Sequence, residues 1–244
     1  MISVIILAGG IGSRVGADRP KQFVEVLGKP IVAYTIEQFE KREDIISVEI
    51  VCHPEWKKYM VALVEQYHFS KVKWIVDGGI DFQHSCMNGI NNLEGELKDT
   101  DYVLIQYAAA PFTSNEIIDD VIRVMKQKNA AISATPCFQL MGTNEGEKSE
   151  SWVDRDKFIQ VASPYGFQYG YIKSVYKRAR EQGLLDTIEP HVTSLIYALG
   201  EPLYNAYGNQ TNIKITTQED LELFEGYVLL KQWKKKGNCD VAER

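Results

Sequence analysis

The sequence predicts an α/β protein with a doubly wound, mostly parallel, Rossmann-like sheet and a protruding arm. Short apolar runs typical of buried strands alternate with amphipathic segments of helical length along most of the 244 residues. The first apolar run, residues 2–7, ends in a glycine-rich turn, which marks the abrupt end of a strand. The alternation breaks once, over residues 137–160, which predicts an excursion from the sheet.

In the first half of the chain, strand candidates alternate with helix candidates. Helices are indicated where apolar residues recur three or four positions apart, as Val32 and Ile36 do after Pro30, a residue suited to a first helical turn. Thr113 and Glu116 have the spacing of a capping box. The predicted strands are 2–7, 45–52, 72–76 and 102–106, and the predicted helices are 30–41, 54–67, 85–93 and 113–127.

The second half contains the excursion at 137–160, which is polar and charged and is expected to form an arm, with a tolerated surface insertion as the alternative. Gly183 ends a predicted helix, and Thr216 with Glu219 is expected to cap the last one. The predicted helices are 169–182, 190–199 and a final one after 216, and the predicted strands are 203–207 and 212–216. Because no repeat or linker divides the chain, we expect one domain over residues 1–244.

The composition argues against several classes of protein. A net charge of −6 disfavours broad binding to nucleic acids, and no apolar stretch reaches the roughly 18 to 20 residues of a membrane span. The N-terminal run is too short for a signal peptide. Neither a zinc site nor a disulfide framework is indicated by the four widely spaced cysteines, Cys52, Cys86, Cys137 and Cys239. We therefore expect a cytoplasmic protein with a small-molecule partner and without nucleic-acid or membrane partners.

The turn after the first strand is a candidate anion site. Gly9, Gly10 and Gly12 carry no side chain, so several backbone N–H groups can approach an anion there. Arg14 and Lys21 lie seven residues apart, and both cations can converge on one polyphosphate. The glycines alone would favour a structural turn. The string matches neither a P-loop nor the dinucleotide-binding fingerprint, because the required lysine and third glycine are missing from their positions.

These residues resemble the signature of a known family. Ala8-Gly9-Gly10-x-Gly12-x-Arg14 with Pro20-Lys21-Gln22 is similar to the motif of the 2-C-methyl-D-erythritol 4-phosphate and ribitol-5-phosphate cytidylyltransferases. Further matches occur in the same order along nearly the whole chain, and these are Asp77-Gly78-Gly79 with Ser85, Ala108-Ala109 with Pro111-Phe112, Val153-Asp154-Arg155, Ser163-Pro164 and Asn212-Ile213-Lys214-Ile215-Thr216. The resemblance implies a nucleotidyltransferase sheet.

The family resemblance implies transfer of CMP from CTP to a polyol phosphate, giving a CDP-polyol and pyrophosphate. It also implies that Mg²⁺ is carried mainly by the CTP phosphates and that the protein is a homodimer joined through the arm. The implied catalytic residues are Arg14, Lys21 and Lys214, since such transfer depends on positioning and on neutralising charge. The implied nucleotide-binding residues are Ala8, Gly9, Gly10, Gly12, Gly79, Ser85 and Ala108, and the implied acceptor-binding residues are Arg155 of a second subunit, Ser163, Thr193 and Lys214.

The sequence departs from the family at five stretches. Relatives usually have His-Asp-Ala-Ala-Arg-Pro at 106–111, and here Tyr107 replaces the Asp that helps to hold magnesium, so no metal ligand is assigned. Mg²⁺ can bind largely through nucleotide phosphates, so this loss is compatible with activity. The other departures are the missing arginine within 80–84, Ser163-Pro164-Tyr165 for Thr-Pro-Gln, 190–194 for a Thr-Asp-Asp segment, and Gln139-Leu140 for Asp-Thr on the arm.

Two hypotheses follow from these departures. The protein is either an active cytidylyltransferase with a rebuilt acceptor pocket, lined by polar residues such as His191, Thr193 and Ser194, or a non-catalytic relative that binds CTP or a CDP product or serves in assembly. The retention of Arg14, Lys21 and Lys214 favours the first. Plainer roles also exist for three single residues, namely a helix N-cap for Ser85, a solvated cation for Arg155 and an exposed position on a strand edge for Lys214.

Overall fold

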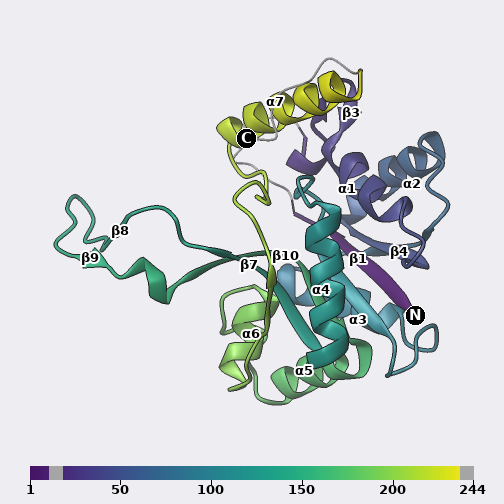
Figure 1. Ribbon diagram of the computed structural model, residues 1–244. Helices are drawn as coiled ribbons and strands as arrows, with labels where there is room; N and C mark the ends of the chain where they lie inside the picture. Colours follow the sequence, from purple (N-terminus) through teal and green to yellow (C-terminus); the bar gives the residue numbers. More distant parts are fainter. Residues whose placement is uncertain (11–18, 237–244) are drawn as a thin grey trace.

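A seven-stranded sheet forms the centre of the computed structural model, which describes residues 1–10 and 19–236 (Figure 1). The strand order is β11-β7-β10-β6-β1-β4-β5. Every neighbouring pair described is parallel except the two that involve β10, so the prediction of a mostly parallel sheet is confirmed. The strands are β1 (Ile2–Ala8), β4 (Ser47–Cys52), β5 (Val72–Asp77), β6 (Tyr102–Tyr107), β7 (Ala130–Pro136), β10 (Ile159–Gln168) and β11 (Asn205–Tyr207).

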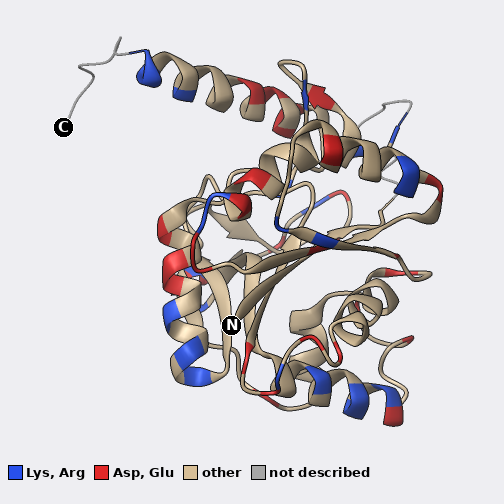
Figure 2. Ribbon diagram, turned by 90° about the vertical axis from the view of Figure 1, so that its right-hand side faces the viewer, with Lys and Arg blue, Asp and Glu red and all other residues tan. Residues whose placement is uncertain are grey.

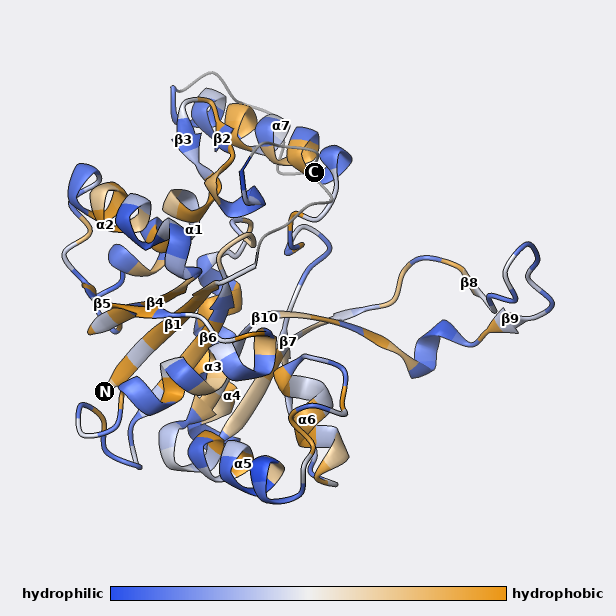
Figure 3. Ribbon diagram, turned by 180° about the vertical axis from the view of Figure 1, so that it is seen from behind, coloured by the Kyte–Doolittle hydropathy of each residue, from blue (hydrophilic) through white to orange (hydrophobic). Residues whose placement is uncertain are grey.

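Helices cover both faces of this sheet. Val4 and Ile6 of β1 belong to the core beneath α1, α2 and α4, whereas Ile5 and Leu7 belong to the core beneath α3, α5 and α6. Successive strand residues face opposite sides of a sheet, which explains why β1 is buried along its whole length and mainly apolar (Figure 3). The helices are α1 (Ile31–Glu40), α2 (Lys57–Gln66), α3 (Phe82–Asn92), α4 (Asn115–Lys128), α5 (Tyr169–Glu181), α6 (Val192–Ala198) and α7 (Gln218–Lys235).

The sequence pattern did not predict two of the inner strands. β7 carries Ala, Ser and Thr in place of a long apolar run, and Pro164 and Gly166 interrupt the pattern of β10. The predicted strand at 212–216 is wrong, because this stretch is irregular in the described part of the chain. Its backbone bonds to the turn after β6 through the Ile215 N–H, which donates to the Ala109 carbonyl oxygen at 2.8 Å.

Three predicted helix caps are also displaced. Ser114, and not Thr113, accepts the capping hydrogen bond of α4, and Thr217 with Asp220 forms the capping box of α7 one residue after the expected pair. α3 begins earlier than expected, with Asp81 as its N-cap. Thr, Ser and Asp are all favourable N-cap residues, so the sequence alone cannot show which of two neighbouring residues caps a helix; the backbone conformation at the helix start decides it.

The arm leaves the sheet where the sequence predicts an excursion, between Pro136 and Ile159, which pair at its base (Figure 1). Near its tip the short strands β8 (Met141–Gly142) and β9 (Trp152–Val153) pair antiparallel. Leu140 is 90% exposed and Trp152 79% exposed. Large apolar side chains at such exposure are unusual unless a partner covers them.

Helix α7 packs over the short strands β2 (Glu25–Val26) and β3 (Lys29–Pro30) through the buried side chains of Phe224 and Val228. Its acidic residues gather near its N-terminus and its lysines near its C-terminus (Figure 2), as the helix dipole favours. Within residues 1–10 and 19–236, no helix is long and apolar enough to cross a membrane.

One buried carboxyl group on β4 predicts a pH-dependent stability. Glu49 is 0% exposed, and its Oε1 atom has no hydrogen-bond partner among the described residues. Burial raises the pKa of Glu49 from 4.5 to about 8. The folded state therefore holds this proton where the unfolded chain releases it, and the free energy of unfolding falls as the pH rises from about 4.5 to about 8.

We expect the Glu49→Gln variant to be more stable than the wild type at pH 8 by on the order of 1–3 kcal/mol, because it removes the cost of ionising a buried group. At pH 4.5 the two proteins should differ little. Thermal melting at both pH values measures the effect, and an equal difference at the two values would contradict it.

Candidate active site

A cavity of about 450 Å³ opens beyond the carboxyl ends of four parallel strands. Strand register places Ala8 beside Cys52 and Cys52 beside Asp77, while Leu7 pairs with Tyr107, so these strands end at one edge of the sheet. The chain passes from β1 to β4 on one side and later returns to β6 on the other, and such a switch in direction is where open α/β sheets bind ligands.

The glycine turn after β1 forms one wall of this cavity, together with Lys21. The Gln22 side chain is buried, and its Nε2 donates to the carbonyl oxygens of Ala8, at 2.9 Å, and Gly10, at 2.8 Å. Gln22 thus joins Lys21 to the glycine turn, a role that the sequence motif did not reveal. Gly12 and Arg14, two of the predicted site residues, lie outside the described residues.

The opposite wall consists of the turn after β5 and the first turns of α3. Gly79 donates its backbone N–H to the Ser85 hydroxyl oxygen at 3.0 Å. A Cβ atom at Gly79 would lie 2.3 Å from the Cβ of His84, so only glycine fits there. Ser85 lies inside α3, and the alternative that it caps the helix is wrong because Asp81 does so.

A second cavity, of about 380 Å³, adjoins the first and shares Tyr107 and Lys214 with it. Ser163, Thr193 and His191 line it, as expected. The Ser194 hydroxyl, another predicted liner, donates to Glu189 Oε2 at 3.4 Å. The two cavities can hold two ligands whose ends meet near Lys214.

Lys214 is positioned by an irregular segment and not by a strand edge, so the alternative of an exposed edge residue is wrong. It is half-buried, and its Nζ lies 4.3 Å from the centroid of the Tyr107 ring. The buried Asn212 anchors the segment by accepting a hydrogen bond from Thr113 Oγ1 at 3.0 Å and donating one to the Ser163 carbonyl oxygen at 2.9 Å. The Thr113 hydroxyl oxygen also accepts a hydrogen bond of 3.1 Å from Gln106 Nε2, so it is engaged in this buried network while Ser114 caps α4.

Comparison with known proteins identifies the family. The family model for 2-C-methyl-D-erythritol 4-phosphate cytidylyltransferase matches residues 2–229. The chain belongs to this cytidylyltransferase family. It is 33% identical over 233 residues to the ribitol-5-phosphate cytidylyltransferase of Lacticaseibacillus paracasei, covering 95% of this chain and 100% of that one. It is 36% identical over 234 residues to the 2-C-methyl-D-erythritol 4-phosphate cytidylyltransferase of Clostridium acetobutylicum, covering 95% and 98%.

Solved structures agree with the assigned fold. A crystal structure of 4-diphosphocytidyl-2C-methyl-D-erythritol synthase superposes with a TM-score of 0.78 at 21% sequence identity, covering 93% of this chain and 98% of that one. The predicted α/β class and family resemblance are thus confirmed for this member of the cytidylyltransferase family.

Arg155, a predicted acceptor-binding residue, lines neither cavity within one chain. It lies on the arm, in the short helix η4 (Arg155–Lys157), and its guanidinium donates to the Phe138 carbonyl oxygen. The alternative role of Arg155, a cation surrounded by solvent, is therefore incomplete, because this hydrogen bond holds the partly buried side chain against the arm.

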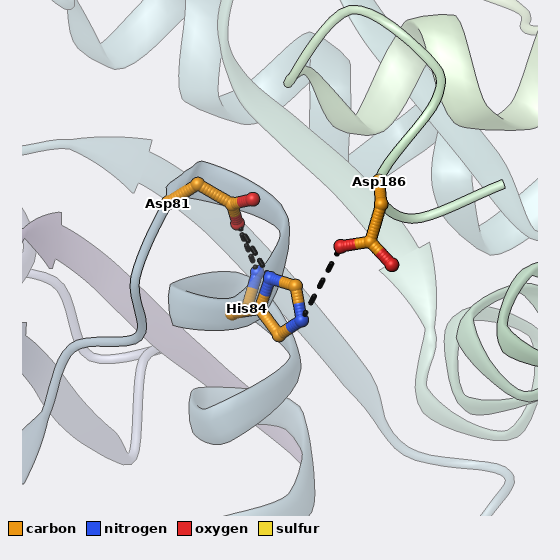
Figure 4. Close-up of side chains that lie close together, drawn as sticks. All are labelled: Asp81, His84 and Asp186. Carbon is orange, nitrogen blue, oxygen red and sulfur yellow. Dashed lines mark hydrogen bonds and ion pairs between the residues drawn. The ribbon is translucent and has the colours of Figure 1, made fainter. Parts of the chain in front are cut away.

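The residues near Tyr107 do not fit a protein-held magnesium ion. In the described part of the chain, one group of side chains of the types that bind metals lies close together, and it consists of Asp81, His84 and Asp186 (Figure 4). Asp81 Oδ1 already accepts hydrogen bonds of 2.8 Å from both the backbone N–H and Nδ1 of His84. Mg²⁺ prefers oxygen ligands, and this group includes an imidazole. We therefore derive no catalytic step through a protein-bound metal.

Four of the five stretches that depart from the family meet in one cluster between the cavities. The Tyr107 hydroxyl lies 2.9 Å from His191 Nδ1, and the Tyr165 hydroxyl donates to that of Tyr107 at 3.5 Å. The Phe82 ring centroid lies 5.6 Å from that of Tyr107 and 5.5 Å from that of His191. The replacements satisfy one another's polar groups, which is what a rebuilt pocket requires.

Burial keeps the Tyr107 hydroxyl and the His191 imidazole of this cluster uncharged near neutral pH. It raises the pKa of the Tyr107 hydroxyl above its ordinary value. Burial also lowers the pKa of the His191 imidazole, and the charge of Lys214 lowers it further. The cluster therefore presents a phenol and a neutral imidazole to the second cavity.

Proposed function

We propose that this protein transfers CMP from CTP to a small phosphorylated polyol and releases pyrophosphate. An oxygen of the acceptor phosphate attacks the α-phosphorus of CTP, and the bond from that phosphorus to the oxygen of the leaving pyrophosphate breaks. The observation that carries this proposal is the position of Lys214, at the junction of a cavity bounded by the glycine turn and a cavity lined by uncharged polar groups. Both phosphorylated reactants would meet at that lysine.

We assign the first cavity to CTP. The backbone of the glycine turn, with Lys21 and Arg14, would hold the triphosphate, and Ala8, Ala108, Gly79 and Ser85 would contact the nucleoside. The location of Lys21, Gly79 and Ser85 on facing walls of one cavity supports this assignment. The positive charges would stabilise the phosphorane-like transition state, which carries more charge on its oxygens than the ground state does.

We assign the second cavity to the acceptor, with Ser163, Thr193 and Lys214 in contact with it. A divalent cation, Mg²⁺, would arrive with CTP and bind mainly to its phosphates. Relatives of this chain are named for ribitol 5-phosphate and for 2-C-methyl-D-erythritol 4-phosphate. The rebuilt cluster around Tyr107 and His191 favours an acceptor other than the methylerythritol phosphate, namely ribitol 5-phosphate or a glycerol phosphate.

Release of pyrophosphate tests the function directly. The protein is incubated with CTP, Mg²⁺ and, separately, ribitol 5-phosphate, glycerol phosphates and 2-C-methyl-D-erythritol 4-phosphate. Release with one acceptor, together with the matching CDP-polyol by mass spectrometry, supports the proposal. Binding of CTP without release for any acceptor would favour the alternative of a non-catalytic CTP- or CDP-binding relative. The presence of Lys21 in the wall of the first cavity and of Lys214 in both cavities argues against that alternative, because a protein that no longer handled a triphosphate would have no evident use for them together.

We also propose that the chain is a single nucleotidyltransferase domain of a cytoplasmic homodimer, joined through the arm. Leu140 and Trp152 on the arm are more exposed than an isolated chain favours. A partner subunit that covers them would bring its Arg155 toward the acceptor cavity. The cysteines of the described part, Cys52, Cys86 and Cys137, are buried and free, in keeping with a reducing compartment.

We expect the Leu140→Asp/Trp152→Ser double variant to be a monomer with an unchanged fold, because it removes the apolar contact that joins the subunits. Light scattering after gel filtration measures the mass. Leu223→Asp on α7, where the leucine is 63% exposed, is the matched control and should remain dimeric. A wild-type protein that is monomeric, or a double variant that stays dimeric, would contradict the role of the arm.

A further inference from the structure

We infer that Tyr165, Tyr107 and His191 form a directed hydrogen-bond chain that fixes His191 as the Nε2–H tautomer. In this tautomer His191 recognises hydroxyl groups of the acceptor by donating a hydrogen bond from Nε2. The inference rests on the proposed function and adds the residues that would select the acceptor. In it His191 contacts the substrate, and Tyr107 acts as a positioning residue through His191.

The direction of the chain follows from its donors. Tyr165 donates its hydroxyl proton to the Tyr107 oxygen, and the Tyr107 hydroxyl lies 2.9 Å from His191 Nδ1. This contact uses a lone pair of the Tyr107 oxygen and leaves its proton available, and we assign that proton to the hydrogen bond with His191 Nδ1. A neutral imidazole that accepts at Nδ1 carries its proton on Nε2. Glu189 Oε1, 3.7 Å from Nε2, favours a proton on that nitrogen.

The position of His191 is determined by buried groups and does not depend on a ligand. Its carbonyl oxygen accepts a hydrogen bond of 3.0 Å from Gln83 Nε2, and Gln83 Oε1 accepts one of 2.9 Å from the Tyr176 hydroxyl. Gln83 is 0% exposed. With Phe82 against its ring, His191 is held in place before any acceptor arrives, which lowers the entropy cost of binding.

The chemistry of the second cavity matches hydroxyl groups. Of its lining residues, His191 offers an uncharged Nε2–H donor and Thr193 both donates and accepts. The Glu189 carboxylate, whose Oε1 lies 3.7 Å from His191 Nε2, is an acceptor beside them. A phosphate would be repelled by Glu189 and requires a cation, and the cation of this cavity is Lys214, whose Nζ lies over the Tyr107 ring at 4.3 Å from its centroid. The acceptor therefore lies with its phosphate at Lys214 and its hydroxyl-bearing carbon chain toward His191. An alkyl phosphate without hydroxyl groups lacks these contacts.

Nuclear magnetic resonance of ¹⁵N-histidine-labelled protein tests the tautomer without any turnover. The chain contains four histidines, so single-histidine variants assign each signal. We expect His191 to be protonated at Nε2 in the wild type and to become a mixture of tautomers in Tyr107→Phe. Tyr197→Phe, on the exposed side of α6, is the matched control and should leave the signal unchanged. A His191 protonated at Nδ1 in the wild type, or a tautomer that Tyr107→Phe does not change, overturns the inference.

Kinetics with the acceptor that releases pyrophosphate test the reading of hydroxyl groups. Loss of one hydrogen bond should raise the KM for this acceptor about three- to tenfold in Tyr107→Phe. The KM for CTP should change less, because the ring that also lines the first cavity is kept. His191→Leu should show at least the same increase, and His191→Gln, which places an amide N–H near the position of Nε2, should recover part of it. Equal acceptor KM values in wild type and His191→Leu overturn the inference while leaving the proposed function intact. Absence of release with every acceptor refutes the proposed function instead, and the tautomer measurement still stands.

Discussion

Replacing Lys21 with alanine is expected to reduce kcat for cytidylyl transfer by on the order of 10²- to 10³-fold, the usual cost of losing one charge-stabilising group at a reacting phosphate. Lys21 lines the first cavity, and its neighbour Gln22 holds the glycine turn in place through two hydrogen bonds. The ammonium group would act mainly where charge develops, so CTP affinity should fall less than kcat. Pyrophosphate release under saturating substrates measures the change.

The control for this variant is Lys58→Ala, which removes an exposed lysine from α2 outside both cavities. It should retain wild-type turnover. Circular dichroism and thermal melting of both variants establish that the fold is intact. A Lys21→Ala protein that is folded and turns over at the wild-type rate would remove the charge-stabilising role from this residue.

The Gly79→Ala variant is expected to weaken CTP binding about 10- to 100-fold. Inserting a methyl group into a tightly packed site costs about 1–3 kcal/mol, and about 1.4 kcal/mol corresponds to a tenfold loss of affinity. The new methyl group would lie 2.3 Å from His84 Cβ and 2.6 Å from the His84 carbonyl carbon. These atoms belong to the first turn of α3, so relief requires the helix start or the turn after β5 to move. Either movement breaks the hydrogen bond from Gly79 to Ser85 at the cavity wall. Calorimetric titration with CTP measures the loss.

Gly78→Ala is the matched control, because its methyl group would meet its nearest atoms at 3.3 and 3.4 Å, where small adjustments suffice. It should bind CTP within a few-fold of the wild type. If the two variants bind equally well, the turn after β5 does not form part of the nucleotide site. Ser85→Ala separates the two contributions, since it removes the hydroxyl acceptor without crowding the turn.

The parallel core could be predicted because its strands bury both faces and so appear as mainly apolar runs, as β1 and β4 do. β7 and β10 could not, because small residues and Pro164 hide the pattern and their burial comes from neighbouring strands and α4. The arm was predictable from its polarity. The positions of the caps depended on backbone angles that no spacing rule distinguishes.

The nucleotide half of the site was predictable from local strings, since the glycine turn, Lys21 and the turn at Gly79 each follow a strand end directly. The contact between Tyr107 and His191 was not, because 84 residues separate them and each alone resembles an ordinary polar residue. The sequence showed only that both stand where relatives have other residues. Gln22 and Asn212 lay within the recognised motifs, but their hydrogen bonds depend on atoms brought together by the fold.

The Tyr165–Tyr107–His191 chain has a consequence for the evolutionary history of this branch of the family. Replacing Tyr107 alone with the shorter aspartate would remove the hydroxyl that contacts both His191 Nδ1 and Tyr165, and replacing His191 alone with an apolar residue would leave the Tyr107 proton without its acceptor. Effects of contacting residues do not add, and here each single replacement passes through a poorly satisfied intermediate. Positions 107, 165 and 191 are therefore expected to change together in evolution, because a replacement at one of them alone leaves polar groups of the others without hydrogen bonds.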